Sequence, residues 1–297
     1  MVTAATFLQL GVSGLTSGAT YALIALGFIT IYRASNILNL AQGDFVMLGG
    51  MLTVTGMSRL GLPYPLAAAV AVMGTGLIGL LAERLVIHPI RNKPLIISIM
   101  ATIGISMTLS GSALLLFGTS PRTLPPLAPA GAVSLGGGVS VSSQALAVLL
   151  VCLLLLAAFH AFSSRTWSGK AMEAAATDRL GADLVGISRS VSRMQAFFIS
   201  AALGAVAGVL ITPLYFMQYN AGALLGLKGF AAAVIGGWGS YAGAVLGGLV
   251  LGVVESLSLA VIPAGYKDAV AFVALLAILA VRSKGLLGSR ALEEARK

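Results

Sequence analysis

SSRTWSGKAMEAAATDRLGADLVGISRSVSRM, residues 163–194, is the one long polar interval in a chain that is otherwise apolar enough to lie in lipid. The interval carries more basic than acidic residues, so the positive-inside rule places it in the cytoplasm. Within it we predict a single helix from Ala171 to Val185, capped at its start by Ser168 and ended by Gly186 in the left-handed conformation. A helix of that length spans about 22 Å.

One face of this predicted helix consists mostly of small side chains. They recur at spacings of three and four residues, which places them on one side of a helix: Ala171, Ala174, Ala175, Asp178, Gly181 and Ala182. Such a face lets another protein surface come close, and the flanking charges can fix its orientation. We therefore predict that the helix docks a cytoplasmic partner. The alternative is an ordinary solvated helix in a loop.

The composition is that of an integral membrane protein. Of the 297 residues, 58% are hydrophobic and only 9% are charged, and the mean hydropathy is +1.00; soluble domains carry roughly 25% charged residues. The apolar runs are long and lack the alternating pattern of membrane strands, so helices are the spanning elements. The predicted fold is an all-α, polytopic transmembrane helix bundle with about eight or nine spans.

Several kinds of site are excluded by the sequence. The net charge of +9 comes from basic residues in connections between apolar runs, which is a topology signal and not a nucleic-acid site. Cys152 is the single cysteine, so the chain can form neither an internal disulfide nor a cysteine metal site. His88 and His160 are isolated, and no metal site is expected. The chain also lacks a phosphate-binding loop and a serine-hydrolase elbow. We therefore expect no catalytic residues and no cofactor in this chain.

Nine apolar segments are predicted to cross the membrane. Their ranges are 7–31, 44–57, 65–87, 95–117, 143–162, 195–217, 223–237, 242–262 and 268–281. A helix needs about 20 residues to cross a bilayer, and the second and seventh segments are shorter than that. Eight crossings with one re-entrant segment is the alternative.

Charge sets the expected topology. Basic residues place the connection around Arg91, the polar interval and the C-terminal tail inside, whereas the Pro- and Gly-rich connection Gly118–Ser142 goes outside. The first six residues carry no Lys or Arg, so we expect the N-terminus outside. The absence of a basic start and of a cleavage site indicates a first span and not a removed signal.

The two short segments resemble each other. NLAQGDFVMLGG, residues 39–50, and GLKGFAAAVIGG, residues 226–237, both begin with polar and glycine residues, become apolar and end in Gly-Gly. Interrupted segments at corresponding positions of two halves indicate an internal repeat. We therefore predict one permease domain, residues 1–297, with inverted repeat halves at about 7–117 and 195–282.

A few polar side chains fall near membrane depth, where an ionisable group facing lipid costs several kcal/mol. Asp44 either caps a helix or contacts substrate, and Lys228 either pairs with a carboxylate or extends to the interface. Glu255 either lines a pathway or makes an interhelical hydrogen bond. The candidate pathway residues are Asn36, Asn39, Gln42, Asp44, Lys228 and Glu255, and Asp268 is a further acid at this depth.

Glycines four residues apart predict close helix packing. The spacing occurs at Gly239, Gly243 and Gly247, at Gly248 and Gly252, and at Gly204 and Gly208.

Three stretches together resemble the permease subunits of bacterial branched-chain amino-acid ABC importers. They are NILNLAQGDFVMLGG (36–50), LKGFAAAVIGGWGSYAGAVLGGLVLGVVES (227–256) and DAVAFVALLAILAVRSKGLLG (268–288), the last with an Arg-x-x-Gly-Leu ending. The likeness is colinear and covers essentially the whole chain. The chain length and the missing N-terminal extension resemble the LivH-type subunit.

The resemblance implies a multi-pass protein of the bacterial cytoplasmic (inner) membrane and a set of partners. These are a second permease of the LivM type, two ATP-binding cassette subunits that bind ATP and Mg, and a periplasmic amino-acid-binding protein. It also implies that residues 168–187 form a coupling helix for an ATPase subunit. The coupling residues carried over are Gly169, Lys170, Ala171, Glu173, Ala174, Ala175, Asp178, Arg179, Gly186 and Ile187. Glu173 departs from the basic residue of many relatives, and Arg179 stands where the general signature has glycine.

Two other classes of transporter remain open on the residues alone. One is an ion-coupled secondary transporter of small amino acids or amides that uses Asp44 or Glu255. The other is a passive channel for small solutes. The resemblance implies leucine, isoleucine and valine as substrates, and related systems carry urea, amides or other acids.

Overall fold

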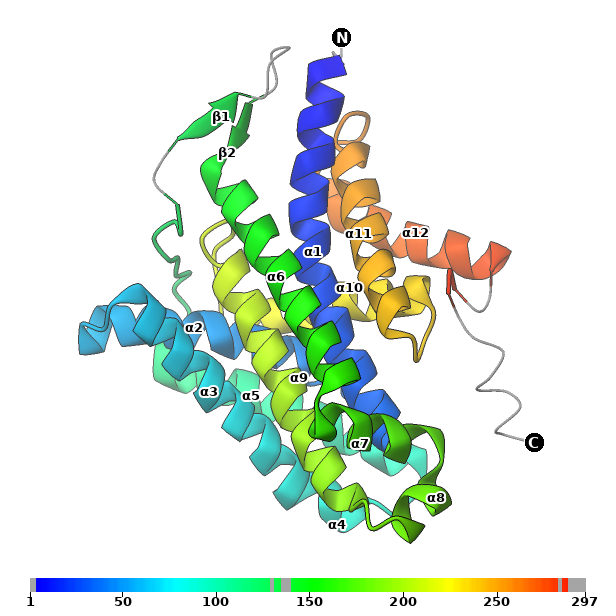
Figure 1. Ribbon diagram of the computed structural model, residues 1–297. Coiled ribbons are helices and arrows are strands. Elements are labelled where there is room, and N and C mark those ends of the chain that lie inside the picture. Colours follow the sequence, from blue (N-terminus) through cyan, green and yellow to red (C-terminus); the bar gives the residue numbers. More distant parts are fainter. Residues whose placement is uncertain (1–3, 129–130, 135–139, 283–284, 288–297) are drawn as a thin grey trace. The chain divides into compact units, whose positions relative to one another are not determined.

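The computed structural model describes residues 4–128, 131–134, 140–282 and 285–287, and within them the chain is almost entirely helical (Figure 1). It divides into two compact units. Unit 1 contains Met1–Ile29, Pro126–Leu153 and Lys228–Lys297, and unit 2 contains Thr30–Pro125 and Leu154–Leu227. Both units draw on both of the predicted repeat halves, and the inverted repeat remains a prediction.

Each of the nine predicted apolar segments contains a helix. The helices are α1 Ala4–Ser35, α2 Gln42–Leu60, α3 Tyr64–Ala82, α5 Leu95–Phe117, α6 Ser143–Arg165, α9 Arg189–Ile211, α10 Ala221–Gly236, α11 Tyr241–Ser258 and α12 Lys267–Val281. Within the described ranges, seven helical stretches are long and apolar enough to cross a membrane. The two others are α2 and α10, the segments that the sequence marks as short. The predicted all-α polytopic bundle is confirmed.

Several boundaries differ from those predicted. Helix α2 has 19 residues and runs through Gly49 and Gly50, so its Gly-Gly pair does not end the segment. Helix α10 does end at its pair, at Gly236. The backbone also breaks before α2, where Asn36 adopts φ 58°. Helix α9 ends at Ile211; Thr212 still has helical angles, and Pro213 after it has no amide hydrogen to continue the helical bonding.

The remaining elements are short. They are the π-helix η1 Glu83–Ile87, α4 His88–Ile90, α7 Trp167–Thr177, α8 Arg179–Leu184, the 3-10 helix η2 Ala264–Tyr266, and the antiparallel strands β1 Ala132–Ser134 and β2 Ser140–Ser142. The hairpin lies in the connection that the sequence places outside, and strand pairing there was not predicted.

Unit 2 is organised around α9, which packs on α2 and α3, while α5 packs on α2. The predicted glycine spacing explains how closely these helices approach. A Cβ added at Gly49 would meet the backbone of Ala205, and one added at Gly208 would meet the carbonyl of Val46. Van der Waals packing between closely approaching backbones is one of the forces that drive helix association in lipid.

Unit 1 uses glycine in the same way. A Cβ at Gly248 or Gly252 of α11 would meet the backbone of α1 at Ala22 or Gly18. On another face of α11, a Cβ at Gly247 would meet α10 at Ala232. The predicted close packing is confirmed for the two four-residue glycine pairs, 204/208 and 248/252.

The end of the Arg-x-x-Gly-Leu segment binds the last carbonyls of α10 in unit 1. The Leu286 and Leu287 amides donate to the carbonyls of Ile235 and Gly236, both at 2.8 Å. Gly285 has φ 72°, and a Cβ there would meet the backbone of Val234 and Gly237. The last carbonyls of a helix have no amide partner within the helix, and the Leu286 and Leu287 amides provide that partner here.

Candidate functional site

The polar interval forms two short helices rather than the one predicted. Helices α7 and α8 are separated by Asp178, whose backbone is extended at φ −136° and ψ 108°. Its carboxylate Oδ1 accepts the amides of Leu180 and Gly181 at 3.0 Å. Asp178 therefore caps α8, and this capping competes with a continuous helix. A second error lies at the start, where Thr166 and not Ser168 caps α7.

The end of the pair follows the prediction. Gly186 adopts the left-handed conformation at φ 79°. The Ile187 amide then donates to the Ala182 carbonyl at 2.9 Å, which satisfies an orphan carbonyl at the end of α8. Ser188 caps α9, so α8 and α9 are joined by a tight link.

Part of the predicted small face lies inward. Ala175 and Ala182 are 4% and 3% exposed, and Met172 is buried beside them. A Cβ at Gly169 would meet the backbone of Phe162 and Ser163, so glycine lets α7 fold back onto the end of α6. Ala171 and Ala174 are half-buried, and Lys170 is exposed. Arg179 begins α8, and its side chain lies outside what the structure describes.

The outward surface of the helix pair is apolar instead. Trp167 is 91% exposed, Leu180 77% and Leu184 88%, and Val185 is 74% exposed. We call these four residues the docking surface. They lie outside the candidate membrane spans, on α7, on α8 and just after α8. Large apolar side chains exposed on a polar, charged segment are a common feature of protein contact sites. Sequence reasoning missed them because it sought a face of small residues.

Ion pairs connect the helix pair to the rest of unit 2. Glu173 of α7 pairs with Arg33, near the end of α1. Asp183 of α8 pairs with Arg189 of α9 at 2.8 Å. The acidic residue at Glu173, which departs from many relatives, is thus matched by a basic residue on α1. These pairs join α7 to α1 and α8 to α9.

The candidate pathway residues of unit 2 cluster around the break before α2. Gln42 is fully buried, donates from Nε2 to the Ser200 carbonyl at 3.1 Å and accepts from the Ser200 hydroxyl at 2.6 Å. Asn39 is 1% exposed, and its Oδ1 accepts the Ala41 amide. Asn36 is exposed. These contacts tie the broken backbone to α9.

Asp44 lies in the first turn of α2, where the helix dipole favours a carboxylate. It is not the capping residue, because the helix begins at Gln42 after Ala41, and no side-chain cap is formed. The Asp44 side chain is 3% exposed. Asp44 therefore lies at the start of a helix, as predicted, but it does not cap that helix with a side-chain hydrogen bond.

The two candidates of unit 1 form one charged cluster. Lys228 of α10 lies 2.5 Å from Glu255 of α11 and 2.6 Å from Asp268 of α12. Its ammonium also donates to the Tyr21 hydroxyl at 3.4 Å, and Lys267 lies 3.8 Å from Glu255. Lys228 thus pairs with carboxylates, and Glu255 makes an interhelical contact. We call these residues the α10–α12 cluster.

The described residues contain no group of three or more His, Cys, Asp and Glu side chains placed to hold a metal ion. Six predicted pathway residues fall into two separate sets, one in each unit. The ten predicted coupling residues all lie between α6 and α9. Arg33, Ser200 and Tyr21, which contact these candidates, carry no sequence signal because they lie far away along the chain.

The described helices define a polytopic α-helical membrane protein with a charged helix pair between α6 and α9 along the chain. The chain belongs to the family described as "Branched-chain amino acid transport system / permease component", whose model matches residues 11–279. It is a multi-pass protein of the bacterial cytoplasmic (inner) membrane, as predicted.

Individual relatives of this chain are permeases of the same kind. The high-affinity branched-chain amino acid transport system permease protein BraD of Pseudomonas aeruginosa is 35% identical, over 97% of this chain and 98% of its own length. The corresponding LivH protein of Escherichia coli (strain K12) is 34% identical, over 97% of both chains. The probable LivH protein of Methanocaldococcus jannaschii is 28% identical over 79% of this chain and 76% of its own. The predicted resemblance to LivH-type permeases is confirmed.

Proposed function

We propose that this chain is the LivH-type permease subunit of an ATP-driven importer of branched-chain amino acids, and that an ATPase subunit docks on α7 and α8. The observation that carries the docking role is the exposed docking surface of Trp167, Leu180, Leu184 and Val185. Four large apolar side chains facing water are costly unless a partner covers them. The proposed partner, an ATPase subunit, follows from membership of this permease family.

The partners follow from the same proposal. A second, LivM-type permease would complete the translocation pathway, and a periplasmic binding protein would deliver the amino acid. Two ATP-binding cassette subunits would bind ATP and Mg²⁺. The substrate class rests on the names of the relatives, which are 34–35% identical. We expect leucine, isoleucine and valine.

The contacts of α7 and α8 provide a mechanical route. ATP-driven closure of the ATPases would displace the helix pair, and the pairs Arg33–Glu173 and Arg189–Asp183 would pass that displacement to α1 and α9. A partner shifts a conformational equilibrium only through its different affinity for the two states. The docking surface must therefore contact the ATPase differently in the inward- and outward-open forms.

The docking role can be tested with Leu184→Asp, because this side chain is exposed and contributes little to the fold. Burying the new carboxylate at the interface would cost about 2 kcal/mol, roughly thirtyfold in docking affinity. We expect loss of ATPase binding and of ATP-dependent leucine uptake, with normal insertion. Leu184→Met keeps the surface apolar and is the matched control. Normal uptake by the aspartate variant would contradict the docking role.

An ion-coupled secondary transporter is the rival function, with Asp44 or Glu255 as the coupling carboxylate. The family match favours the importer, and Glu255 Oε1 is held by Lys228 at 2.5 Å. The rival predicts uptake by this chain alone that disappears when the ion gradient is dissipated. The importer predicts no uptake without ATPase subunits.

A further inference from the structure

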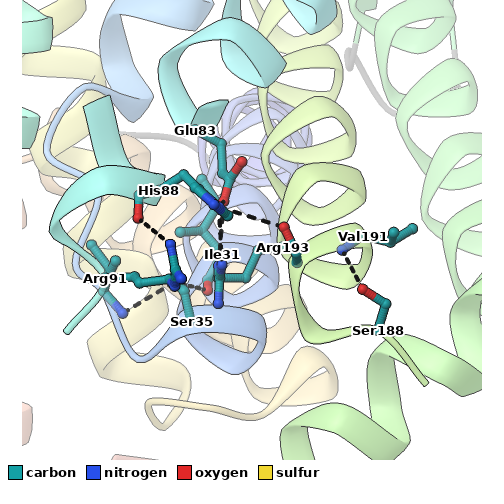
Figure 2. A network of polar contacts seen from close by, with 10 residues as sticks. Ile31, Ser35, Glu83, His88, Arg91, Ser188, Val191 and Arg193 are labelled. Carbon is teal, nitrogen blue, oxygen red and sulfur yellow. Dashed lines mark hydrogen bonds and ion pairs between the residues drawn. The ribbon is translucent and has the colours of Figure 1, made fainter. Parts of the chain in front are cut away.

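Unit 2 contains a third charged network that the proposed docking does not use (Figure 2). Glu83 lies in η1, His88 begins α4 and Arg193 lies in the second turn of α9. The Glu83 side chain is 0% exposed, Arg193 14% and His88 26%.

The local sequence explains why these side chains meet. Pro89 has no amide hydrogen, and its ring would clash with the Leu85 carbonyl in a regular α-helix. The chain widens into the π-helix, and the His88 amide donates to the Glu83 carbonyl across five residues. Single π-turns often occur at functional positions. This wider turn brings the His88 ring and the Glu83 carboxylate to the same side, facing α9 (Figure 2).

Arg193 is shared between the two acceptors. Its Nε donates to Glu83 Oε1 at 3.3 Å, and its Nη2 lies 3.5 Å from His88 Nδ1. The Ser190 hydroxyl is 3.4 Å from the same Nδ1. Glu83 Oε1 lies 3.8 Å from His88 Nδ1, beyond hydrogen-bonding distance. Nδ1 can accept from Arg193 only while the imidazole is neutral.

Protonation of His88 would rearrange this network. The imidazolium carries a hydrogen on Nδ1, so it repels Arg193 and can donate to Glu83 instead. Arg193 would then lose His88 as an acceptor and would compete with the imidazolium for Glu83. Glu83 Oε2 forms no hydrogen bond to any described residue, so the carboxylate can take a second donor.

We propose that Glu83 and Arg193 are positioning residues that hold the start of α9 on η1, and that a proton on His88 loosens this hold and slows transport. The proposal rests on the proposed coupling function. Arg193 follows the α8–α9 link by one turn, and Arg189 in that turn pairs with Asp183 of α8. The start of α9 would therefore move with the docked helix pair, as would the end of α1.

Other ionisable groups around His88 are few. The Arg91 guanidinium donates to the His88 backbone carbonyl at 3.1 Å. Arg84 lies in η1 and is exposed. Helix α5, which packs on η1, has no ionisable side chain, and α3 has only Tyr64 at its opposite end. The end of α1 brings Tyr32 and Arg33, and Arg33 pairs with Glu173.

The test uses the complete importer in proteoliposomes, with ATP and variable pH on the ATPase side. The measurement is leucine taken up per ATP hydrolysed, which removes the pH dependence of the ATPase itself. The wild type should lose roughly two- to thirtyfold between about pH 8 and pH 5. His88→Gln, which keeps an acceptor but cannot be charged, should keep the high ratio throughout. His160→Gln, at the other histidine of the chain, should follow the wild type.

Two further variants separate positioning from folding. Arg193→Lys keeps the charge but cannot contact both acceptors, so uptake per ATP should fall at pH 8 with normal insertion. Glu83→Gln should do the same. An unchanged pH profile in His88→Gln would overturn the inference, even where Leu184→Asp abolishes uptake. If Leu184→Asp transports normally, the docking proposal itself fails, whatever His88→Gln does.

Discussion

Two ion-paired regions of the molecule differ in how deeply their charges are buried. In the α10–α12 cluster, Lys228 and Glu255 have side chains 7% and 0% exposed. In the pair that ties α7 to α1, Arg33 and Glu173 are 23% and 44% exposed. A buried charge that loses its partner costs several kcal/mol, whereas a solvated pair contributes about 0–1 kcal/mol. The first region therefore holds three helices together, and we expect the second to break and re-form during transport.

The largest effect on stability is expected at Lys228, in the α10–α12 cluster. Lys228→Met leaves the fully buried Glu255 without its main partner and should destabilise the protein by about 3–5 kcal/mol. The measurement is the thermal stability of the purified chain in detergent, together with the amount inserted in the membrane. Removing both charges, in Lys228→Met with Glu255→Met, should recover much of the loss. Equal stability of the single variant and the wild type would show that Lys228 is not structural.

A smaller effect is expected at the break between α7 and α8. Asp178→Ala removes the cap of α8 and should cost about 0.5–2 kcal/mol, confined to that short helix. In the wild type the Asp178 carboxylate binds the Leu180 and Gly181 amides. Faster hydrogen exchange at these two amides in the alanine variant would show that the cap is lost. Asp178→Asn should preserve the cap. Unchanged exchange in the alanine variant would mean that the carboxylate does not hold the break.

The smallest effect on stability is expected at the exposed pair. Glu173→Gln should change the free energy of unfolding by less than about 1 kcal/mol, because both partners are reached by water. The same variant should lower leucine uptake per ATP, since α7 loses its connection to α1. A large drop in stability with normal uptake would reverse the distinction between the two regions.

Sequence reasoning was most reliable where one short stretch contained the whole signal. Long apolar runs predicted the helices, and Gly186 predicted the left-handed end of α8. Reasoning failed where a local competitor intervened, as at Asp178, whose carboxylate caps a new helix instead of continuing the old one. It could not pair Arg33 with Glu173, or Glu83 with Arg193, because these partners are more than 100 positions apart and a single sequence carries no record of contact.

The π-helix was missed for a related reason. Pro89 predicts a break, but the segment instead widens by one residue and continues, which brings Glu83 toward α9. Exposure of Leu180 and Leu184 was also not predicted, since apolar residues in a short helix are more often buried. Side-chain direction at these positions depends on how α7 folds back onto α6 at Gly169.

The central claim is that the membrane helices have no energy source of their own and are moved through α7 and α8. Leucine accumulation in vesicles that hold this chain and its companion permease, with and without the ATPase subunits, tests this most directly. Accumulation against a gradient should require both ATPase and ATP. Uphill accumulation by the permeases with no nucleotide-hydrolysing subunit present would contradict the account.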